Sequence, residues 1–190
     1  MGLGIVGSEG IDTLNKSISY TSFGPRLSFA HRITERDQLS TGLTYEWRNY
    51  STGSTYNGNA LTISAIFTHA LDSSSNVAFI MGYDSVVQQN AFNSYYGGTI
   101  GFGFYKELPR GFTAQGQGTA HLANFYDVNP FALVTRADQN LTGSLTLTKR
   151  DWNIAGFAPS LNYTYTRNFS NISLYDFDSH SVDLRLTKDF

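Results

Sequence analysis

The sequence predicts an all-β fold, an antiparallel transmembrane β-barrel with about ten strands along its 190 residues. The first observation is a period of two, in which apolar and polar residues alternate in run after run. The second is the polar face itself, which holds Thr, Ser, Gln, Asn and Gly, while charged residues make up only 15% of the chain. The third is an alternation of short and long connections between the runs, which is typical of transmembrane barrels.

The last run of the chain shows this alternation most clearly. Three apolar residues alternate there with polar ones, and the chain stops at an aromatic residue of the same parity. These four residues are Val182, Leu184, Leu186 and Phe190. The edge strand of a soluble sandwich has the same alternation, but the last strand of a barrel must also close the sheet and place an aromatic residue at the membrane interface. We therefore predict that these four residues form a membrane-assembly signal.

The composition excludes several classes of protein. The chain is long enough for one domain, residues 1–190, and it has no cysteine, which excludes disulfides and thiolate chemistry. Its net charge of -2 gives no basis for a nucleic-acid partner, and no run approaches the roughly 18 apolar residues of a membrane helix. The N-terminal sequence MGLGIVGSEG is not a secretory signal, so we expect a mature form or a fragment of a longer protein.

Nine runs alternate well, and the shorter run 3–7 adds a tenth strand. The nine runs are 16–33, 39–50, 61–68, 77–84, 96–105, 112–122, 141–148, 157–166 and 182–187. The parity of run 16–33 changes at Gly24-Pro25, which predicts either a β-bulge in one strand or a tight turn between two strands. Ten strands can close an antiparallel barrel, or they can form the C-terminal part of a larger one.

The connections indicate an orientation in the membrane. Short turns are predicted at 34–38, 72–76, 107–111 and 149–152, and longer loops at 8–15, 51–57, 88–94, 126–137 and 168–179. With the C-terminus in the periplasm, the short turns fall on the periplasmic side and the longer loops fall outside the cell. The expected location is the outer membrane of a Gram-negative bacterium.

Charged residues of both signs alternate onto the inward face. They are Glu46, Arg48, Asp84, Asp183 and Arg185. Mixed signs predict an internal network of ion pairs and hydrogen bonds, although the wetness of a lumen is by itself enough to retain such residues. Small residues predict a flat stretch of the lumen wall with room for a plug, a neighbouring chain or a solute. They are Gly97, Thr99, Gly101 and Gly103.

One arrangement of residues has catalytic potential. His121 and His180 both fall toward the outer ends of their strands, and Asp178 is close to His180 in sequence. Scattered polar residues of the lumen and rim explain these positions better than an active site does. The sequence contains no zinc-ligand spacing, phosphate-binding loop or nucleophile elbow. We therefore expect no enzyme activity, no cofactor and no metal.

Residues near the C-terminus follow a longer pattern: Gly-x-x-Pro before an aromatic strand, then Arg-Asn, Ser-Asn-x-x-x-Tyr-x-Phe-Asp, and a last strand ending in Phe. The residues that carry it are Gly156, Pro159, Tyr163, Tyr165, Arg167, Asn168, Ser170, Asn171, Tyr175, Phe177, Asp178 and Phe190. Arg136-x-Asp138 and the sequence GPRLSF at 24–29 also fit. In these features the chain resembles the C-terminal barrel domain of the surface lipoprotein assembly modifier (Slam) family.

The resemblance implies a Gram-negative outer-membrane barrel of up to fourteen strands behind a periplasmic TPR domain, in a family whose full members help move lipoproteins to the cell surface. This chain has no TPR helices and is too short for fourteen strands, so export by this chain alone does not follow from the resemblance. The expected function is export or surface display of lipoproteins, and the expected partners are outer-membrane lipids, the barrel-assembly machinery and a lipoprotein client. A small porin or structural barrel is the alternative, and an outer-membrane hydrolase is a third interpretation.

Overall fold

The computed structural model describes residues 2–11, 19–50, 54–152 and 157–187. These residues form one sheet of ten strands, and each strand pairs antiparallel with its neighbours in sequence. The strands are β1 (Gly2–Ile11), β2 (Ser19–Arg32), β3 (Asp37–Tyr50), β4 (Gly58–Asp72), β5 (Ser75–Gln88), β6 (Tyr95–Leu108), β7 (Phe112–Val128), β8 (Thr135–Lys149), β9 (Ala158–Ser170) and β10 (Phe177–Thr187). Three short 3-10 helices lie between strands: η1 (Ser54–Tyr56), η2 (Ala91–Asn93) and η3 (Ser173–Tyr175). No helix in these ranges is long and apolar enough to cross a membrane.

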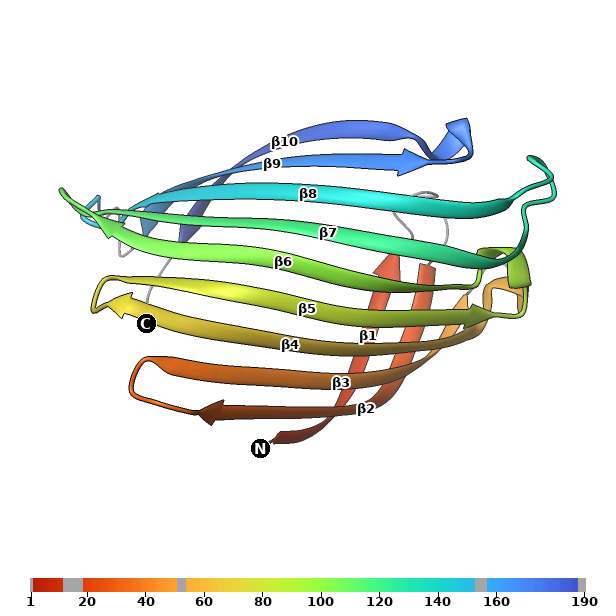
Figure 1. Ribbon diagram of the computed structural model, residues 1–190, viewed down its shortest axis with the longest axis horizontal. Coiled ribbons are helices and arrows are strands. Elements are labelled where there is room, and N and C mark those ends of the chain that lie inside the picture. The colour runs from red at the N-terminus through yellow and green to blue at the C-terminus, as the bar shows by residue number, and fades with distance from the viewer. Residues whose placement is uncertain (1, 12–18, 51–53, 153–156, 188–190) are drawn as a thin grey trace.

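The sheet curves, so that β1 and part of β2 pass behind the middle strands (Figure 1). Among the described residues, β1 pairs only with β2 and β10 pairs only with β9. The sheet therefore has the form of a barrel wall with a seam that is open between β1 and β10. The all-β fold and the ten strands are confirmed, while closure into a membrane barrel stays a prediction.

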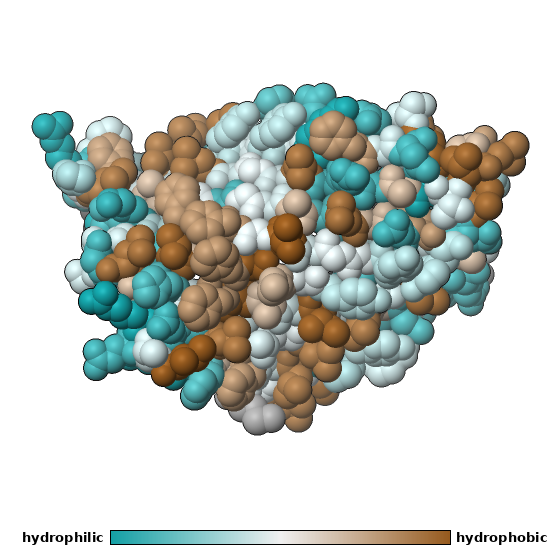
Figure 2. All heavy atoms as spheres, viewed as in Figure 1, coloured by the Kyte–Doolittle hydropathy of each residue, from teal (hydrophilic) through white to brown (hydrophobic). Residues whose placement is uncertain are grey.

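The distribution of polar and apolar side chains between the two faces of the sheet is the reverse of that in a soluble protein, where apolar side chains are buried. Large apolar side chains are exposed, and most of those on any one strand share one parity, as Ile100, Phe102 and Phe104 show on β6. Figure 2 shows apolar side chains in several groups on this face, the largest left of the centre, interspersed with hydrophilic ones. The buried side chains are small or polar for the most part, including Ser22, Ser75, Thr113, Asp138, Ser160, Asn168, Ala60, Ala114 and Ala123. The interior of the curved sheet is therefore its polar side.

The connections differ between the two ends of the sheet. At one end, which we call the turn end, three connections have two to four residues each: 33–36, 73–74 and 109–111. At the other end, the loop end, the described connections include residues 89–94, 129–134 and 171–176 (right-hand side of Figure 1). The predicted alternation is confirmed for these connections. The β8–β9 connection, residues 150–157, departs from it because it lies at the turn end and is longer.

Three predicted loops are too long. Residues 8–11 belong to β1, and the rest of the predicted loop 8–15 lies outside the described residues. Strands β7 and β8 extend until Val128 pairs with Thr135, and β10 begins where Phe177 pairs with Asn168. Hydrogen bonds between backbones hold these strand ends together, so pairing continues through residues without an apolar pattern. The loops predicted at 126–137 and 168–179 were therefore wrong at their boundaries.

The parity change at Gly24-Pro25 produces neither a bulge nor a turn. Strand β2 is continuous, and its register with β3 is unchanged from the pair Phe23–Trp47 to the pair Arg26–Thr44. Phe23 is already exposed on the outward parity, so no extra residue is needed to reset the alternation. Gly24 has a different role, since a Cβ at this position would lie 1.8 Å from the Tyr45 carbonyl oxygen. Glycine is required there because the backbones of β2 and β3 approach closely.

Candidate functional site

The inward charged residues form separate pairs. On β3, Arg48 Nη2 lies 2.8 Å from Glu46 Oε2, and the two side chains are 25% and 17% exposed. On β10, at one edge of the sheet, Arg185 Nη2 lies 3.7 Å from Asp183 Oδ2, and these side chains are 66% and 43% exposed. The first pair is short and largely shielded from solvent, whereas the second is long and exposed and therefore weak. Each of these two pairs lies within a single strand.

Asp84 has a partner that the sequence did not indicate. Its Oδ1 lies 2.9 Å from Nε2 of His121, although Asp84 is on β5, His121 is on β7 and β6 runs between them. The imidazole crosses β6 at Gly97, where a Cβ would lie 2.4 Å from His121 Nε2. The predicted flat stretch of wall is therefore occupied at Gly97 by a side chain from the neighbouring strand. An aspartate two strands away from an inward histidine, with glycine between them, becomes recognisable once the register of the three strands is known.

A ladder of uncharged polar side chains covers the inward face of β8 and β9. Thr146 donates a hydrogen bond of 2.8 Å to the Asn162 side-chain oxygen, and Thr148 donates one of 3.0 Å to Ser160. The amide of Asn162 in turn lies 3.5 Å from Asp183 on β10. These bonds satisfy buried polar groups between neighbouring strands and therefore fix the register of the last three strands.

Several motif residues meet at the β9–β10 loop and fasten it to β8. Asn171 donates a hydrogen bond of 2.8 Å to the Thr135 carbonyl and accepts one of 2.9 Å from the Ala137 amide. Asn168, which is 4% exposed, donates a bond of 2.7 Å to the Tyr175 carbonyl. A side chain that hydrogen-bonds to both a backbone donor and a backbone acceptor replaces a pair of backbone hydrogen bonds between strands. The Arg-Asn and Ser-Asn parts of the motif thus hold one loop in place.

Arg136 joins this loop to the end of β7. Its guanidinium makes a two-pronged contact with Asp138, with Nε–Oδ1 and Nη2–Oδ2 distances of 3.0 and 2.5 Å. The same group stacks on the rings of Tyr175 at 3.5 Å and Phe125 at 4.5 Å from their centroids. The Arg136 and Asp138 side chains are only 18% and 9% exposed, so this charge-assisted contact is well shielded from water.

Asn129 is a site residue that the sequence analysis missed. It is 4% exposed, and its side-chain oxygen accepts hydrogen bonds from the Phe131 and Ala132 amides at 3.0 and 3.1 Å. Its side-chain nitrogen lies 3.4 Å from the Tyr175 hydroxyl, which links the β7–β8 loop to the β9–β10 loop. The Asn129-Pro130 dipeptide is a known turn signal and was the available indication in the sequence.

The remaining motif residues are spread along β9 and β10. Arg167 pairs with Asp176 at 2.5 Å and lies 3.9 Å from Asp178, which is opposite it on β10. Pro159 is at the turn end, opposite Leu186. Ser170 accepts a hydrogen bond from the Ile172 amide. The assembly residues Val182, Leu184 and Leu186 are 66%, 82% and 63% exposed, and Gly156 and Phe190 lie outside the described residues.

His121 and His180 do not form a pair, in line with the preferred interpretation of scattered polar residues, because the two side chains lie on opposite faces. His180 shares the parity of Val182, and its Nδ1 lies 2.7 Å from the hydroxyl of the outward Tyr163. Its Nε2 is 3.8 Å from Asp178, so that pair is also outward. His121 faces inward and contacts Asp84. Across residues 2–11, 19–50, 54–152 and 157–187, no three His, Cys, Asp or Glu side chains are grouped as metal ligands.

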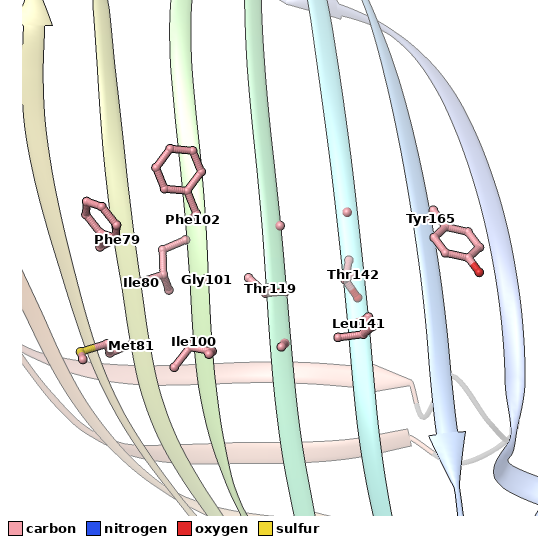
Figure 3. A pocket seen from close by; sticks show the side chains of 13 residues that line it. Phe79, Ile80, Met81, Ile100, Gly101, Phe102, Thr119, Leu141, Thr142 and Tyr165 are labelled. Atoms are coloured by element: carbon pink, nitrogen blue, oxygen red, sulfur yellow. The ribbon is translucent and has the colours of Figure 1, made fainter.

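The outward face carries a shallow apolar hollow of about 780 Å³ over β5–β9. Its floor includes Gly118 and Gly143, which pair across β7 and β8, and each has open space where a Cβ would stand. Figure 3 shows Phe102 on one side of the hollow and Tyr165 on the other. Most of the lining residues are apolar, so the hollow is an apolar part of the outward surface.

Comparisons with known proteins agree with the motif. No solved structure matches the chain. A curated relative, surface lipoprotein assembly modifier 1 of Haemophilus influenzae, is 24% identical over 171 residues, which are 88% of this chain and 34% of the relative. The chain thus spans about a third of the length of that relative. The family model of the surface lipoprotein assembly modifiers matches residues 11–190, and the chain therefore belongs to this family.

Proposed function

We propose that this chain is part of an outer-membrane β-barrel of a Gram-negative bacterium that assists the assembly of lipoproteins on the cell surface. The observation that carries the proposal is the reversed sheet, with exposed apolar residues outside and paired polar residues inside, in a member of this family. Such a sheet is stable in hydrocarbon, where backbone groups are satisfied between strands and apolar side chains contact lipid.

The dimensions of the sheet support a membrane location. Strand β6 has 14 residues, which at 3.3 Å per residue and a tilt of 45° cover roughly 33 Å of bilayer thickness. Aromatic pairs lie on the outward face toward the loop end, with ring centroids 5.1 Å apart for Phe23 and Trp47 and 5.4 Å apart for Tyr96 and Tyr126. Aromatic residues at this height match an interfacial girdle.

The open seam supports the view that the sheet belongs to a larger barrel. The outer edges of β1 and β10 have no strand partner among the described residues, and unpaired strand edges are very unfavourable in lipid. Additional strands of the same protein, placed between β1 and β10, satisfy both edges. In this arrangement the turn end and the C-terminus are periplasmic, and the loop end is outside the cell.

The proposed role is not enzymatic. The partners are outer-membrane lipids, the barrel-assembly machinery and a lipoprotein client that reaches the surface. Arg136, Asn168 and Asn171 hold the last loops together at the end of the sheet where the client emerges. Their positions support a barrel with fixed outer loops.

The test uses the full-length protein in its own cells. The gene is deleted, and proteins labelled with radioactive palmitate are then removed from intact cells by an added protease. The proposal predicts that deletion lowers the released, labelled fraction and that the wild-type gene restores it. An unchanged fraction, together with ion conductance of the purified protein in planar bilayers, contradicts the proposal and favours a porin.

A further inference from the structure

The tips of the β7–β8 and β9–β10 loops carry an exposed apolar patch. Phe131, Leu133 and Leu174 are 88%, 77% and 78% exposed, and we call these three residues the tip patch. Figure 2 shows apolar atoms at the right-hand end, where Figure 1 places the β7–β8 loop. The patch is beyond the ends of β7 and β10, so the lipid that contacts the outward strands does not account for its exposure. Exposed apolar clusters of this kind mark contact surfaces.

The tip patch is held rigidly. The Asn129 side chain binds two amides of the β7–β8 loop, and its backbone amide and carbonyl bond Val134 and Leu133 at 2.9 and 2.8 Å. Leu133 has a φ of 58°, a left-handed conformation that branched residues rarely adopt. Loops that hold a residue in such a conformation are fixed by their surroundings, and such residues concentrate at binding sites. A fixed loop loses little entropy when a partner binds to it.

The two loops are also locked to each other. The contact of Asn129 with the Tyr175 hydroxyl joins the loop that carries Phe131 to the short helix that carries Leu174. Asn171 bonds the start of β8 through Thr135. Both parts of the tip patch therefore belong to one platform.

The charge around the tip patch selects the type of partner. Residues 126–138 and 167–180 contain four aspartates and two arginines. Arg136 is paired with Asp138, and Arg167 is shared between Asp176 and Asp178, so the surroundings have a net negative charge. Asp127, next to the loop, is exposed. Negative charge repels a phosphate-rich membrane surface and attracts a polypeptide with basic residues.

We propose that the tip patch is a docking site for an extended polypeptide in which apolar residues alternate with Lys or Arg. The inference rests on the proposed function for the identity of that polypeptide as a lipoprotein client. Phe131, Leu133 and Leu174 contact the apolar residues of the client, while Asp127 and the aspartates near η3 attract its basic residues. The platform therefore holds the client at the outer rim as it emerges.

The test measures peptide binding by fluorescence anisotropy. The full-length protein is placed in phosphatidylcholine nanodiscs, and empty nanodiscs provide the baseline. Three labelled peptides of equal length are compared, composed of Leu and Lys, Leu and Glu, or Ser and Lys. The inference predicts that the protein binds the Leu-Lys peptide most tightly and that both replacements weaken binding.

The variant that removes the patch is Phe131→Ser, Leu133→Asn and Leu174→Ser combined. Asn is chosen at position 133 because it tolerates the left-handed conformation. Loss of central apolar contacts is expected to weaken binding of the Leu-Lys peptide about thirty-fold. The control is Ile33→Ser, which removes an apolar residue that is 53% exposed at the turn end, and its affinity should equal that of the wild type.

A second variant keeps the inference falsifiable if the triple variant folds poorly. Asp127→Lys leaves the tip patch intact and reverses one charge. It should therefore lower the affinity for the Leu-Lys peptide and raise the affinity for the Leu-Glu peptide. Equal binding by wild type, triple variant and Asp127→Lys overturns the inference. The inference is also overturned if the wild-type protein does not bind the Leu-Lys peptide. It is overturned as well if the wild-type protein binds phosphatidylglycerol vesicles in preference to this peptide.

This result is separable from the test of the proposed function. If deletion of the gene leaves lipoprotein display unchanged, the proposed function fails while the peptide measurements still decide whether the docking site exists. If deletion reduces display but the triple variant binds the Leu-Lys peptide like the wild type, the docking inference fails and the function stands.

Discussion

Substitution of Ile100 by arginine distinguishes a lipid-facing surface from a water-facing one. Ile100 lies near the middle of β6 and is 67% exposed, so its side chain has few contacts within the protein. In a soluble protein, replacing so exposed a side chain changes the free energy of unfolding by no more than about 0.5 kcal/mol. The effect of the substitution therefore reports the solvent around the sheet rather than lost packing.

In a bilayer the expected effect is much larger. An arginine on the lipid face near the bilayer midplane costs about 2–4 kcal/mol of folding free energy. Thr99, the preceding residue, has the opposite parity and faces the lumen, so Thr99→Arg provides the matched control. We expect Thr99→Arg to cost less than about 1 kcal/mol, because its charge remains in water.

The assay is urea unfolding of the full-length protein folded into phosphatidylcholine vesicles, followed by tryptophan fluorescence. The reasoning predicts that the midpoint for Ile100→Arg falls well below that of the wild type and of Thr99→Arg. Equal midpoints for all three proteins would refute the assignment of this face to lipid. A larger loss for Thr99→Arg would reverse the assignment of the two faces.

Two further substitutions test close packing and loop structure. Gly24→Ala forces a Cβ against the Tyr45 carbonyl and should lower the free energy of unfolding by about 1–3 kcal/mol in the same assay. The control is Gly143→Ala, which has open space for the Cβ and should leave the free energy of unfolding unchanged. Equal losses of stability in the two variants would contradict the close approach of β2 and β3. Asn129→Ala removes the hydrogen-bond acceptor of the amides of residues 131–132. These amides should then exchange hydrogen at least ten-fold faster, as measured by mass spectrometry, because the loss of the two bonds lowers the free energy of local opening by about 1.4 kcal/mol or more. Asn129→Asp keeps the acceptor oxygen and should preserve their protection; unchanged exchange in the alanine variant would show that the bonds do not hold the loop.

Much of the fold could be predicted because the outward and inward faces of the sheet carry opposite chemistries, which alternate on successive residues. Runs such as Leu145-Thr146-Leu147 and Phe102-Gly103-Phe104 carry this alternation, and the structure places each in the expected strand. The pattern fails at the strand ends near Val128 and Phe177, where polar and apolar residues no longer alternate strictly. Backbone pairing continues there, and no side-chain pattern reveals it.

The contacts of the site were harder to predict because they join distant residues. The pairing of Asp84 with His121 depends on the absence of a side chain at Gly97, which requires the register of three strands to be known. The outward position of His180, in contrast, follows from the parity it shares with Val182, and the sequence contained that information. Parity thus assigns each residue to a face, whereas partners across strands need the register.

The most direct test of the lipid-facing assignment uses the two tryptophans of the chain. Trp47 is 41% exposed on the outward face of β3, and Trp152 lies at the turn end. In a Trp152→Phe variant of the full-length protein, Trp47 fluorescence is measured in vesicles whose acyl chains carry bromine. Further native tryptophans are replaced by phenylalanine. The account predicts strong quenching by the brominated chains and little quenching by acrylamide in the water. Strong quenching by acrylamide, with none by bromine, would contradict it.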